Sequence, residues 1–173
     1  LPRPWTLPRL PPSVPPVSEP QWASMILASL QARMSATRRP GKVLRPLAGA
    51  PRIQRQIERL RRTRMIDRLV VATSDDRTDD VLIEIARAAP VAVFRGDLED
   101  VLSRYIGALD AFGEGAAHVV RLTGDCPLAD PELIDVVIAR HLATGADYTA
   151  NTCGRRTFPK GLDVDIVKTA VLR

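Results

Sequence analysis

The sequence has few of the residues on which disulfide frameworks, metal clusters and membrane spans depend. Its 173 residues include two cysteines and two histidines, and no CxxC pair occurs. These counts exclude a disulfide-stabilised scaffold and argue against a structural zinc domain. No stretch approaches the ~18 consecutive apolar residues that a membrane-spanning helix needs. Because the cysteine content fits a reducing compartment, we expect a cytoplasmic protein with no membrane partner.

Lysine is scarce as well, and arginine supplies most of the positive charge. Of the 25 basic residues, 22 are arginine, and the formal net charge is +5. A basic protein can be a nucleic-acid binder, but six of these arginines fall within residues 52–64, on the predicted exposed face of a single helix. Positive charge equally fits a polyanionic small substrate such as a nucleoside triphosphate. We therefore expect a nucleotide as the partner and no nucleic acid.

Proline is concentrated at one end of the chain. Eight of the fifteen prolines lie within the first twenty residues. Proline lacks an amide donor and fixes φ, so this segment can form neither a helix nor a central strand. We predict a disordered, proline-rich extension over residues 1–24, although such segments also serve as ligands for aromatic grooves. Residues 25–173 would form the folded domain, with Met25 just before its first strand.

From Met25 onward, apolar runs alternate with segments of helical periodicity. We expect strands over residues 25–30, 69–74, 91–94, 118–122, 147–150 and 163–167, and helices over residues 51–64, 78–89, 98–112 and 131–143. Asp130 followed by Pro131 is typical of a helix start. The strands are continuous apolar runs, a pattern that indicates a mostly parallel sheet with helices on both faces. Ligands of such folds bind at the carboxyl ends of the strands.

The loop after the first strand is the first candidate site. Its sequence, QARMSATRRPGKVL over residues 31–44, combines small residues with the cations Arg33, Arg38, Arg39 and Lys42. Small residues let backbone amides approach phosphate oxygens, and the cations neutralise their charge. The loop lacks the glycine spacing of a Walker A motif, and the chain contains no GxGxxG. The pattern fits either a phosphate-binding loop or a basic connection.

Acidic residues mark two further candidate segments. In LTGDCPL (122–128), Asp125 follows the fourth predicted strand and is either a metal ligand or a turn residue bound to backbone. In GLDVDI (161–166), Asp163 and Asp165 would share one face of an extended segment. Two adjacent carboxylates repel unless a cation lies between them, and oxygen ligands suit Mg²⁺. The alternative is the polar outer face of an edge strand.

Several segments together resemble a known family. They are QARMSATRRPGKVLRPLAG, VVATSDD, VFRGDLEDVLSRY, VVRLTGDCPLADPELID, and ADYTANT followed by FPKGLDVDI. In this order they resemble the cytidylyltransferase family of the spore-coat polysaccharide biosynthesis F type, which is similar to the CMP-sugar synthetases for 3-deoxy-manno-octulosonate and acylneuraminate. The resemblance covers about residues 25–173. It implies a Rossmann-like α/β fold of the nucleotide-diphospho-sugar transferase type, with Mg²⁺ as cofactor and CTP as co-substrate.

The resemblance also implies roles for individual residues. Arg33 and Lys42 match phosphate-binding positions, and Asp125 matches a metal-binding acid. Asp163 and Asp165 match a later acidic pair that holds metal near the sugar. Segments that line the nucleotide pocket in the family match Thr73, Ser74, Asp75, Ser103 and Arg104. We interpret Arg121 and Cys126 as structural.

The implied activity is nucleotidyl transfer. A sugar or sugar-phosphate oxygen would attack the α-phosphorus of CTP and release pyrophosphate, in the biosynthesis of a surface polysaccharide or glycan; the resemblance also allows a homodimer. The family usually reads ARMGSTR where this chain reads ARMSATR, so Ser35 replaces a glycine and Ala36 a serine. The chain ends at Arg173, inside a helix predicted to start near Lys168, and we expect a C-terminal truncation. The alternative is a non-catalytic nucleotide-sugar-binding remnant of the same family.

Overall fold

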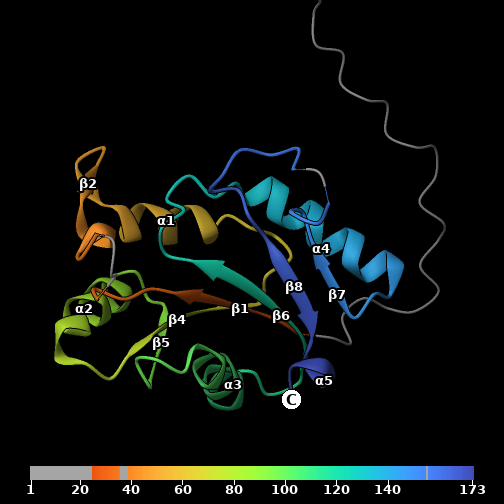
Figure 1. Cartoon of the computed structure of the whole chain (residues 1–173), viewed down its shortest axis with the longest axis horizontal. Coiled ribbons are helices and arrows are strands. Elements are labelled where there is room, and N and C mark those ends of the chain that lie inside the picture. Colours follow the sequence, from red (N-terminus) through yellow and green to blue (C-terminus); the bar gives the residue numbers. More distant parts are fainter. Residues whose placement is uncertain (1–24, 36–38, 155) are drawn as a thin grey trace, which may run out of the picture.

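The computed structural model describes residues 25–35, 39–154 and 156–173, so the extension predicted over residues 1–24 lies outside the described residues. Helices cover both faces of a central sheet (Figure 1). The strands of this sheet are β1 (Met25–Gln31), β4 (Arg68–Ser74), β5 (Ala92–Gly96), β6 (Ala116–Thr123), β7 (Tyr148–Ala150) and β8 (Asp165–Lys168). The α-helices are α1 (Arg52–Leu60), α2 (Asp80–Ala88), α3 (Val101–Phe112), α4 (Pro131–Thr144) and α5 (Thr169–Leu172).

The sheet has the strand order β5-β4-β1-β6-β8-β7. Strands β5, β4, β1 and β6 are parallel, whereas β8 runs antiparallel to both β6 and β7. The prediction of a mostly parallel sheet covered on both faces is therefore confirmed. Because β1 is central and pairs with β4 and β6, the loops that follow these three strands meet at one edge of the sheet.

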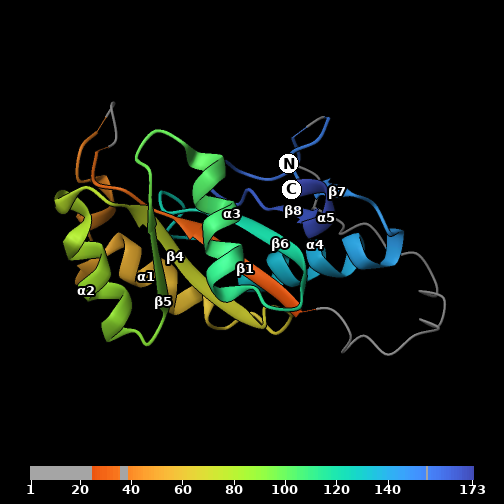
Figure 2. The ribbon, with the colours of Figure 1, turned by 90° about the horizontal axis from the view of Figure 1, so that it is seen from below.

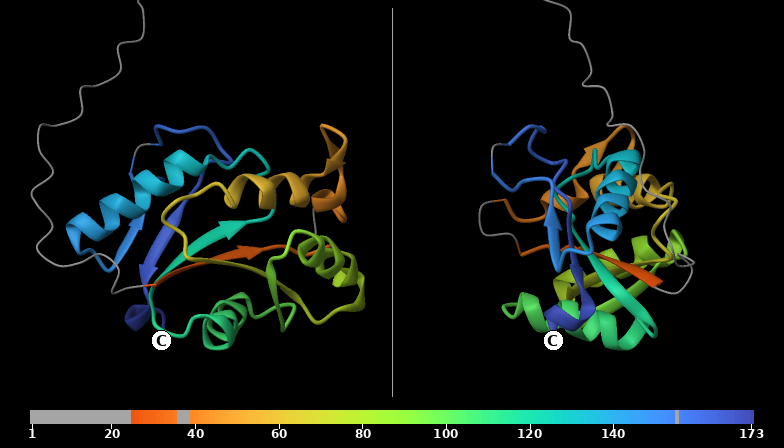
Figure 3. Two further views of the ribbon diagram at one scale, coloured as in Figure 1. Left: turned by 180° about the vertical axis from the view of Figure 1, so that it is seen from behind. Right: turned by 90° about the vertical axis from the view of Figure 1, so that its right-hand side faces the viewer.

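Alternation along the strands sorts their side chains between two layers. Ile26, Ala28 and Leu30 of β1 pack in the core formed with α1, α2 and α4, whereas Leu27 packs in the core formed with α3. Figures 2 and 3 show α3 on one side of the sheet and α1 and α4 on the other. By the same alternation, Gln31 of β1 points toward the α3 side.

Helix α1 shows why the apolar spacing was informative. Ile53, Ile57 and Leu60 stand at i, i+4 and i+7, the spacing of one helical face, and all three are fully buried. Each contributes roughly 1.5–3 kcal/mol by its burial. The prediction that this helix extends to residue 64 is wrong. It ends at Leu60, and the carboxylate of Asp135 accepts hydrogen bonds from the amides of Arg64 and Met65 in the turn that follows.

The connection between β1 and α1, which includes the loop predicted over residues 31–44, contains short regular elements. A 3₁₀ helix, η2 (Lys42–Leu44), is followed by a hairpin of β2 (Pro46–Leu47) and β3 (Ala50–Pro51). The hairpin turns through Ala48 and Gly49, both with positive φ, and only the glycine signals such a turn in the sequence.

Helix starts were partly predictable. Asp130 caps α4 as expected, because its carboxylate accepts a hydrogen bond from the amide of Leu133. Helix α3 begins later than predicted, at Val101, with Asp100 as its cap. Val101 and Leu102 are apolar but exposed, in the first turn of this helix. No helix among the described residues combines the length and apolarity needed to cross a membrane.

Candidate functional site

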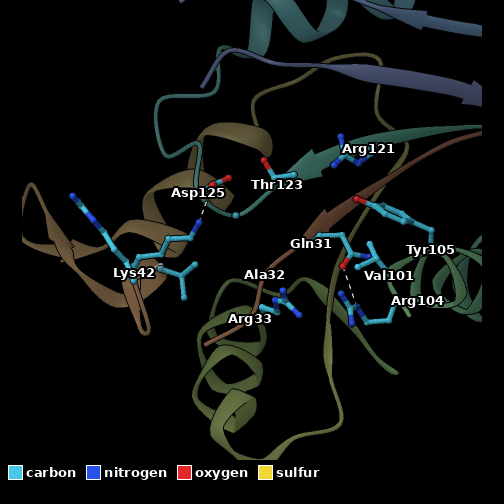
Figure 4. A pocket seen from close by; sticks show the side chains of 13 residues that line it. Gln31, Ala32, Arg33, Lys42, Val101, Arg104, Tyr105, Arg121, Thr123 and Asp125 are labelled. Carbon is cyan, nitrogen blue, oxygen red and sulfur yellow. Dashed lines mark hydrogen bonds and ion pairs between the residues drawn. The ribbon is translucent and has the colours of Figure 1, made fainter. Parts of the chain in front are cut away.

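Two adjoining hollows lie where β1 and β6 end. The first has a volume of about 660 Å³ and the second about 530 Å³, and Arg121, Thr123 and Asp125 line both. The first hollow is lined further by side chains of the β1 loop and of α3, which Figure 4 shows from close by. Open hollows at the carboxyl ends of parallel strands are where ligands bind in folds of this class. The structure therefore has hollows large enough for a ligand at the strand ends where the sequence predicted the site.

The loop after β1 supplies the cations of the first hollow. Arg33, Arg39 and Lys42 all line it. The guanidinium of Arg33 donates to the carbonyl oxygen of Leu98 at 3.1 Å, which orients it beside α3. Arg38 and Ala36 of the predicted phosphate-binding segment lie outside the described residues, and Ser35 is exposed.

Lys42 lines the first hollow and forms an ion pair with Asp125, in the segment that follows β6. Its Nζ lies 2.8 Å from Oδ2 of Asp125, and the two side chains are 31% and 48% exposed (Figure 4). Burial alone would raise the pKa of Asp125, but the hydrogen bond and charge of Lys42 hold that pKa below its usual value. Asp125 therefore stays a carboxylate at neutral pH. The structure joins the two residues that the sequence predicted separately.

Two backbone contacts fix the position of Asp125. The amide of Gly124 donates to the carbonyl oxygen of Gln31 at 2.7 Å, which ties the β6 loop to the end of β1. The side-chain amide of Gln56, fully buried in α1, donates to the carbonyl oxygen of Thr123 at 2.8 Å. Sequence reasoning missed Gln56, although a glutamine among the apolar positions of a helix is the available signal.

Asp163 and Asp165 have different surroundings. Asp163 precedes β8 and lines the second hollow, where both of its carboxylate oxygens accept hydrogen bonds from Arg156. Asp165 is 9% exposed, and its oxygens accept from Arg121 at 2.6 Å and from the hydroxyl of Tyr148 at 2.9 Å. An arginine therefore balances each carboxylate, Arg156 for Asp163 and Arg121 for Asp165.

The second hollow offers carboxylate oxygens to a divalent cation. Within the part of the chain that the structure describes, no three His, Cys, Asp or Glu side chains gather closely enough to enclose a metal. Asp125 and Asp163 nevertheless line the same hollow. The hydrogen bond from Arg156 lowers the pKa of Asp163, and the nearby negative charge of Asp125 opposes that lowering. Two carboxylates completed by phosphate oxygens and water fit the oxygen-only coordination of Mg²⁺. Asp165 fits less well, because its side chain is only 13% exposed, whereas that of Asp163 is 41% exposed.

The five predicted nucleotide-pocket residues are not brought together. Arg104 lines the first hollow and donates to Oε1 of Gln31 at 3.1 Å and to the carbonyl oxygen of Leu98. Thr73 and Ser74 are fully buried and bind the carboxylate of Asp79. The remaining two, Asp75 and Ser103, are exposed.

Three residues that line the first hollow were missed or interpreted as structural. The buried Nε2 of Gln31 and the buried hydroxyl of Tyr105 have no hydrogen-bond partner among the described residues. Burial raises the pKa of Tyr105 to about 12, so its hydroxyl keeps its proton and remains a donor. Arg121, interpreted above as structural, lines both hollows. Unpartnered polar atoms that face a hollow are costly unless a ligand or water meets them.

Comparisons with known proteins agree with this geometry. A family model for cytidylyltransferases matches residues 27–162. The spore coat polysaccharide biosynthesis protein SpsF of Bacillus subtilis is 44% identical over 128 residues, and the match covers 72% of this chain and 52% of SpsF. The 3-deoxy-manno-octulosonate cytidylyltransferase of Geobacter sulfurreducens is 39% identical over 119 residues, 66% of this chain and 44% of that enzyme. The chain thus spans about half the length of these curated relatives.

Solved structures extend the comparison to the fold. A cytidylyltransferase from Leptospira borgpetersenii superposes with a TM-score of 0.81 at 34% identity, covering 86% of this chain and 62% of that one. A CMP:2-keto-3-deoxy-manno-octonic acid synthetase complexed with CTP superposes with a TM-score of 0.67 at 17% identity, covering 86% and 76%. The resemblance stated from the sequence motifs is confirmed, and the chain belongs to the cytidylyltransferase family.

Proposed function

We propose that the chain forms the nucleotide-binding part of a CTP-dependent cytidylyltransferase, which activates a sugar or sugar acid for a surface polysaccharide or glycan in the cytoplasm. The observation that carries the proposal is the placement of Arg33, Lys42 and Asp125 around one hollow at the carboxyl ends of β1 and β6. Two cations and one carboxylate at that edge suit a triphosphate and its counter-ion. The names of the relatives in the comparisons support CTP as the nucleotide.

Each hollow takes one reactant in this proposal. The triphosphate occupies the first hollow, where Arg33 and Lys42 hold its oxygens and orient the α-phosphorus. The acceptor occupies the second hollow, and Arg121, at the boundary between the two, binds its anionic group. One acceptor oxygen, either a phosphate oxygen or a hydroxyl that gives up its proton to water, then forms a bond to the α-phosphorus in line with the bond that breaks, and pyrophosphate leaves with the electron pair.

Asp125 and Asp163 would hold Mg²⁺, which neutralises charge on the phosphate oxygens when it is bound. Lys42 contributes positive charge on the same side, so its side chain stabilises charge that moves onto the leaving pyrophosphate. The non-catalytic alternative would tolerate loss of these residues. Arg33, Lys42 and Asp125 are all present and line one hollow, which supports the catalytic proposal.

Isothermal titration of the 173-residue chain with CTP, UTP, ATP and GTP tests the proposal, each in Mg²⁺ and in EDTA. We expect CTP to bind most tightly, and Mg²⁺ to strengthen that binding in the wild type but much less in Asp125→Asn. Equal binding of all four nucleotides would indicate a diffuse basic surface and overturn the proposal. If Mg²⁺ leaves the wild-type affinity for CTP unchanged, the metal role of Asp125 and Asp163 is wrong.

A further inference from the structure

Asp79 is a fully buried carboxylate with no place in the function proposed above. It ends the short 3₁₀ helix η3 (Arg77–Asp79) that precedes α2. Its Oδ2 accepts hydrogen bonds from the hydroxyl of Thr73 at 2.8 Å, the amide of Ser74 at 3.0 Å and the hydroxyl of Ser74. Its Oδ1 accepts from the amide of Met34 at 2.6 Å. A buried carboxylate needs such partners, and three of the four come from the end of β4.

The fourth contact reaches the phosphate-binding loop at Met34, in its first half. The carbonyl oxygen of Met34 accepts a hydrogen bond from the amide of Gly41 at 2.9 Å, so these two residues close the neck of the loop. Gly41 has a φ of 66°, a left-handed conformation that glycine adopts without strain. Arg33 directly precedes this neck and Lys42 directly follows it. The backbone that Asp79 holds is therefore the backbone that carries both cations.

Thr73 and Ser74 belong to this arrangement rather than to the wall of either hollow. Thr73 alternates with Val70 and Ala72, which pack toward α3, so its side chain lies on the opposite side of the sheet from Gln31. Neither Thr73 nor Ser74 lines a hollow. Their hydroxyls are fully buried and bind Asp79. They hold the carboxylate in place, and the carboxylate holds the loop.

We propose that Asp79 is a positioning residue of the triphosphate site. It fixes the neck of the loop at Met34, so that Arg33 and Lys42 face the first hollow before the nucleotide arrives, and Thr73 and Ser74 act through it. The inference rests on the function proposed above. A neck that is already held in place loses less conformational entropy on binding, so this hydrogen bond strengthens binding of the phosphates without touching them. The base and ribose gain nothing from it.

An effect on binding of the β- and γ-phosphates, but not of the base and ribose, would distinguish a positioning role of Asp79 from a purely structural one. CTP and CMP share the base, ribose and α-phosphate, but only CTP reaches the loop with its β- and γ-phosphates. Asp135 supplies a matched control, because it is also a buried carboxylate, 8% exposed, that accepts hydrogen bonds from backbone amides, those of Arg64 and Met65 at 3.1 Å. It lines neither hollow. Its loss lowers stability without reaching the loop.

The experiment is titration of wild type, Asp79→Asn and Asp135→Asn with CTP and with CMP, together with thermal melts. The asparagine at position 79 keeps the shape, but it cannot accept on all sides, so one donor of the cluster meets an amide N–H. We expect Asp79→Asn to weaken CTP binding roughly 10-fold or more, and CMP binding by less than about 3-fold. Asp135→Asn should lower the melting temperature comparably and leave the ratio of CTP to CMP affinity unchanged.

Thr73→Val provides a second variant if Asp79→Asn does not fold. It removes one hydroxyl donor to Asp79 at nearly constant volume, and the CTP to CMP affinity ratio should fall by about 3-fold or more. The inference is overturned if the foldable variants weaken CTP and CMP equally, or weaken neither. It is also overturned if Asp135→Asn changes the ratio as much. Wild-type chain that shows no preference for CTP over other triphosphates would instead refute the proposed function.

Discussion

Replacing Lys42 by alanine tests its two roles separately, as an ion-pair partner of Asp125 in the free protein and as a ligand of the triphosphate. In the free protein Lys42 pairs with Asp125, with Nζ and Oδ2 2.8 Å apart and both side chains about a third to a half exposed. An ion pair this exposed contributes roughly 0–1 kcal/mol to the free energy of unfolding. For a domain of this size, the melting temperature of Lys42→Ala should fall by less than roughly 4 °C.

The binding role is larger. A hydrogen bond from an ammonium group to a phosphate is charge-assisted and contributes about 1.5–3 kcal/mol, so Lys42→Ala should weaken CTP binding roughly 10- to 150-fold. Isothermal titration measures the affinity, and differential scanning fluorimetry measures the melting temperature.

Arg62→Ala is the matched control, because Arg62 is exposed, follows α1 and lines neither hollow. It removes the same charge and should leave the affinity within about 2-fold, a difference of ~0.4 kcal/mol. Equal small losses in both variants would show that a diffuse basic surface binds CTP, and they would refute the assignment of Lys42.

Two further predictions concern the loop after β6 and the far end of the sheet. Gly124→Ala would place a Cβ 2.9 Å from the Cβ of Ala32 and 3.0 Å from the carbonyl oxygen of Gln31. The substitution should therefore displace Asp125, lower the melting temperature by several degrees and weaken Mg²⁺·CTP binding. An unchanged melting temperature and affinity would contradict this. Burial lowers the pKa of His118 and of His141, whose ring nitrogens lie 3.0 Å apart. The unfolded chain therefore binds more protons than the folded chain just below pH ~6.5, and stability should fall as the pH decreases through that value. Thermal melts from pH 5 to 8 should show this slope in wild type and a flatter one in His141→Gln.

Local patterns predicted most of the regular elements, because those patterns act within a few residues. The spacing of Ile53, Ile57 and Leu60 marks the buried face of α1, and Asp130 with Pro131 marks the start of α4. Where a boundary depends on distant residues, the sequence was uninformative. The end of α1 at Leu60 is set by Asp135, which accepts hydrogen bonds from the amides of Arg64 and Met65, 71 and 70 positions away along the chain.

The same distinction applies to the site. The loop after β1 and Asp125 could be predicted because each follows a strand of a parallel sheet, and such strands end at one edge. The hydrogen-bond partner of each polar side chain could not be predicted in this way. Thr73 and Ser74 were expected near the nucleotide, but they face a buried carboxylate supplied by η3. Gln31 and Tyr105 gave no signal, because their importance lies in unpartnered atoms that only packing reveals.

The surroundings of Asp125 and Asp165 indicate which carboxylate is available to a ligand. Asp125 is half-exposed and has one strong partner, Lys42. Water already screens that pair, so a triphosphate that also attracts Lys42 can open it at small cost. Asp165 is 9% exposed and bound through both oxygens, and removing a partner would leave a buried charge unpaired, a cost of several kcal/mol. Asp165 is therefore suited to hold Arg121 between the two hollows, whereas Asp125 is suited to exchange its partner when the nucleotide binds.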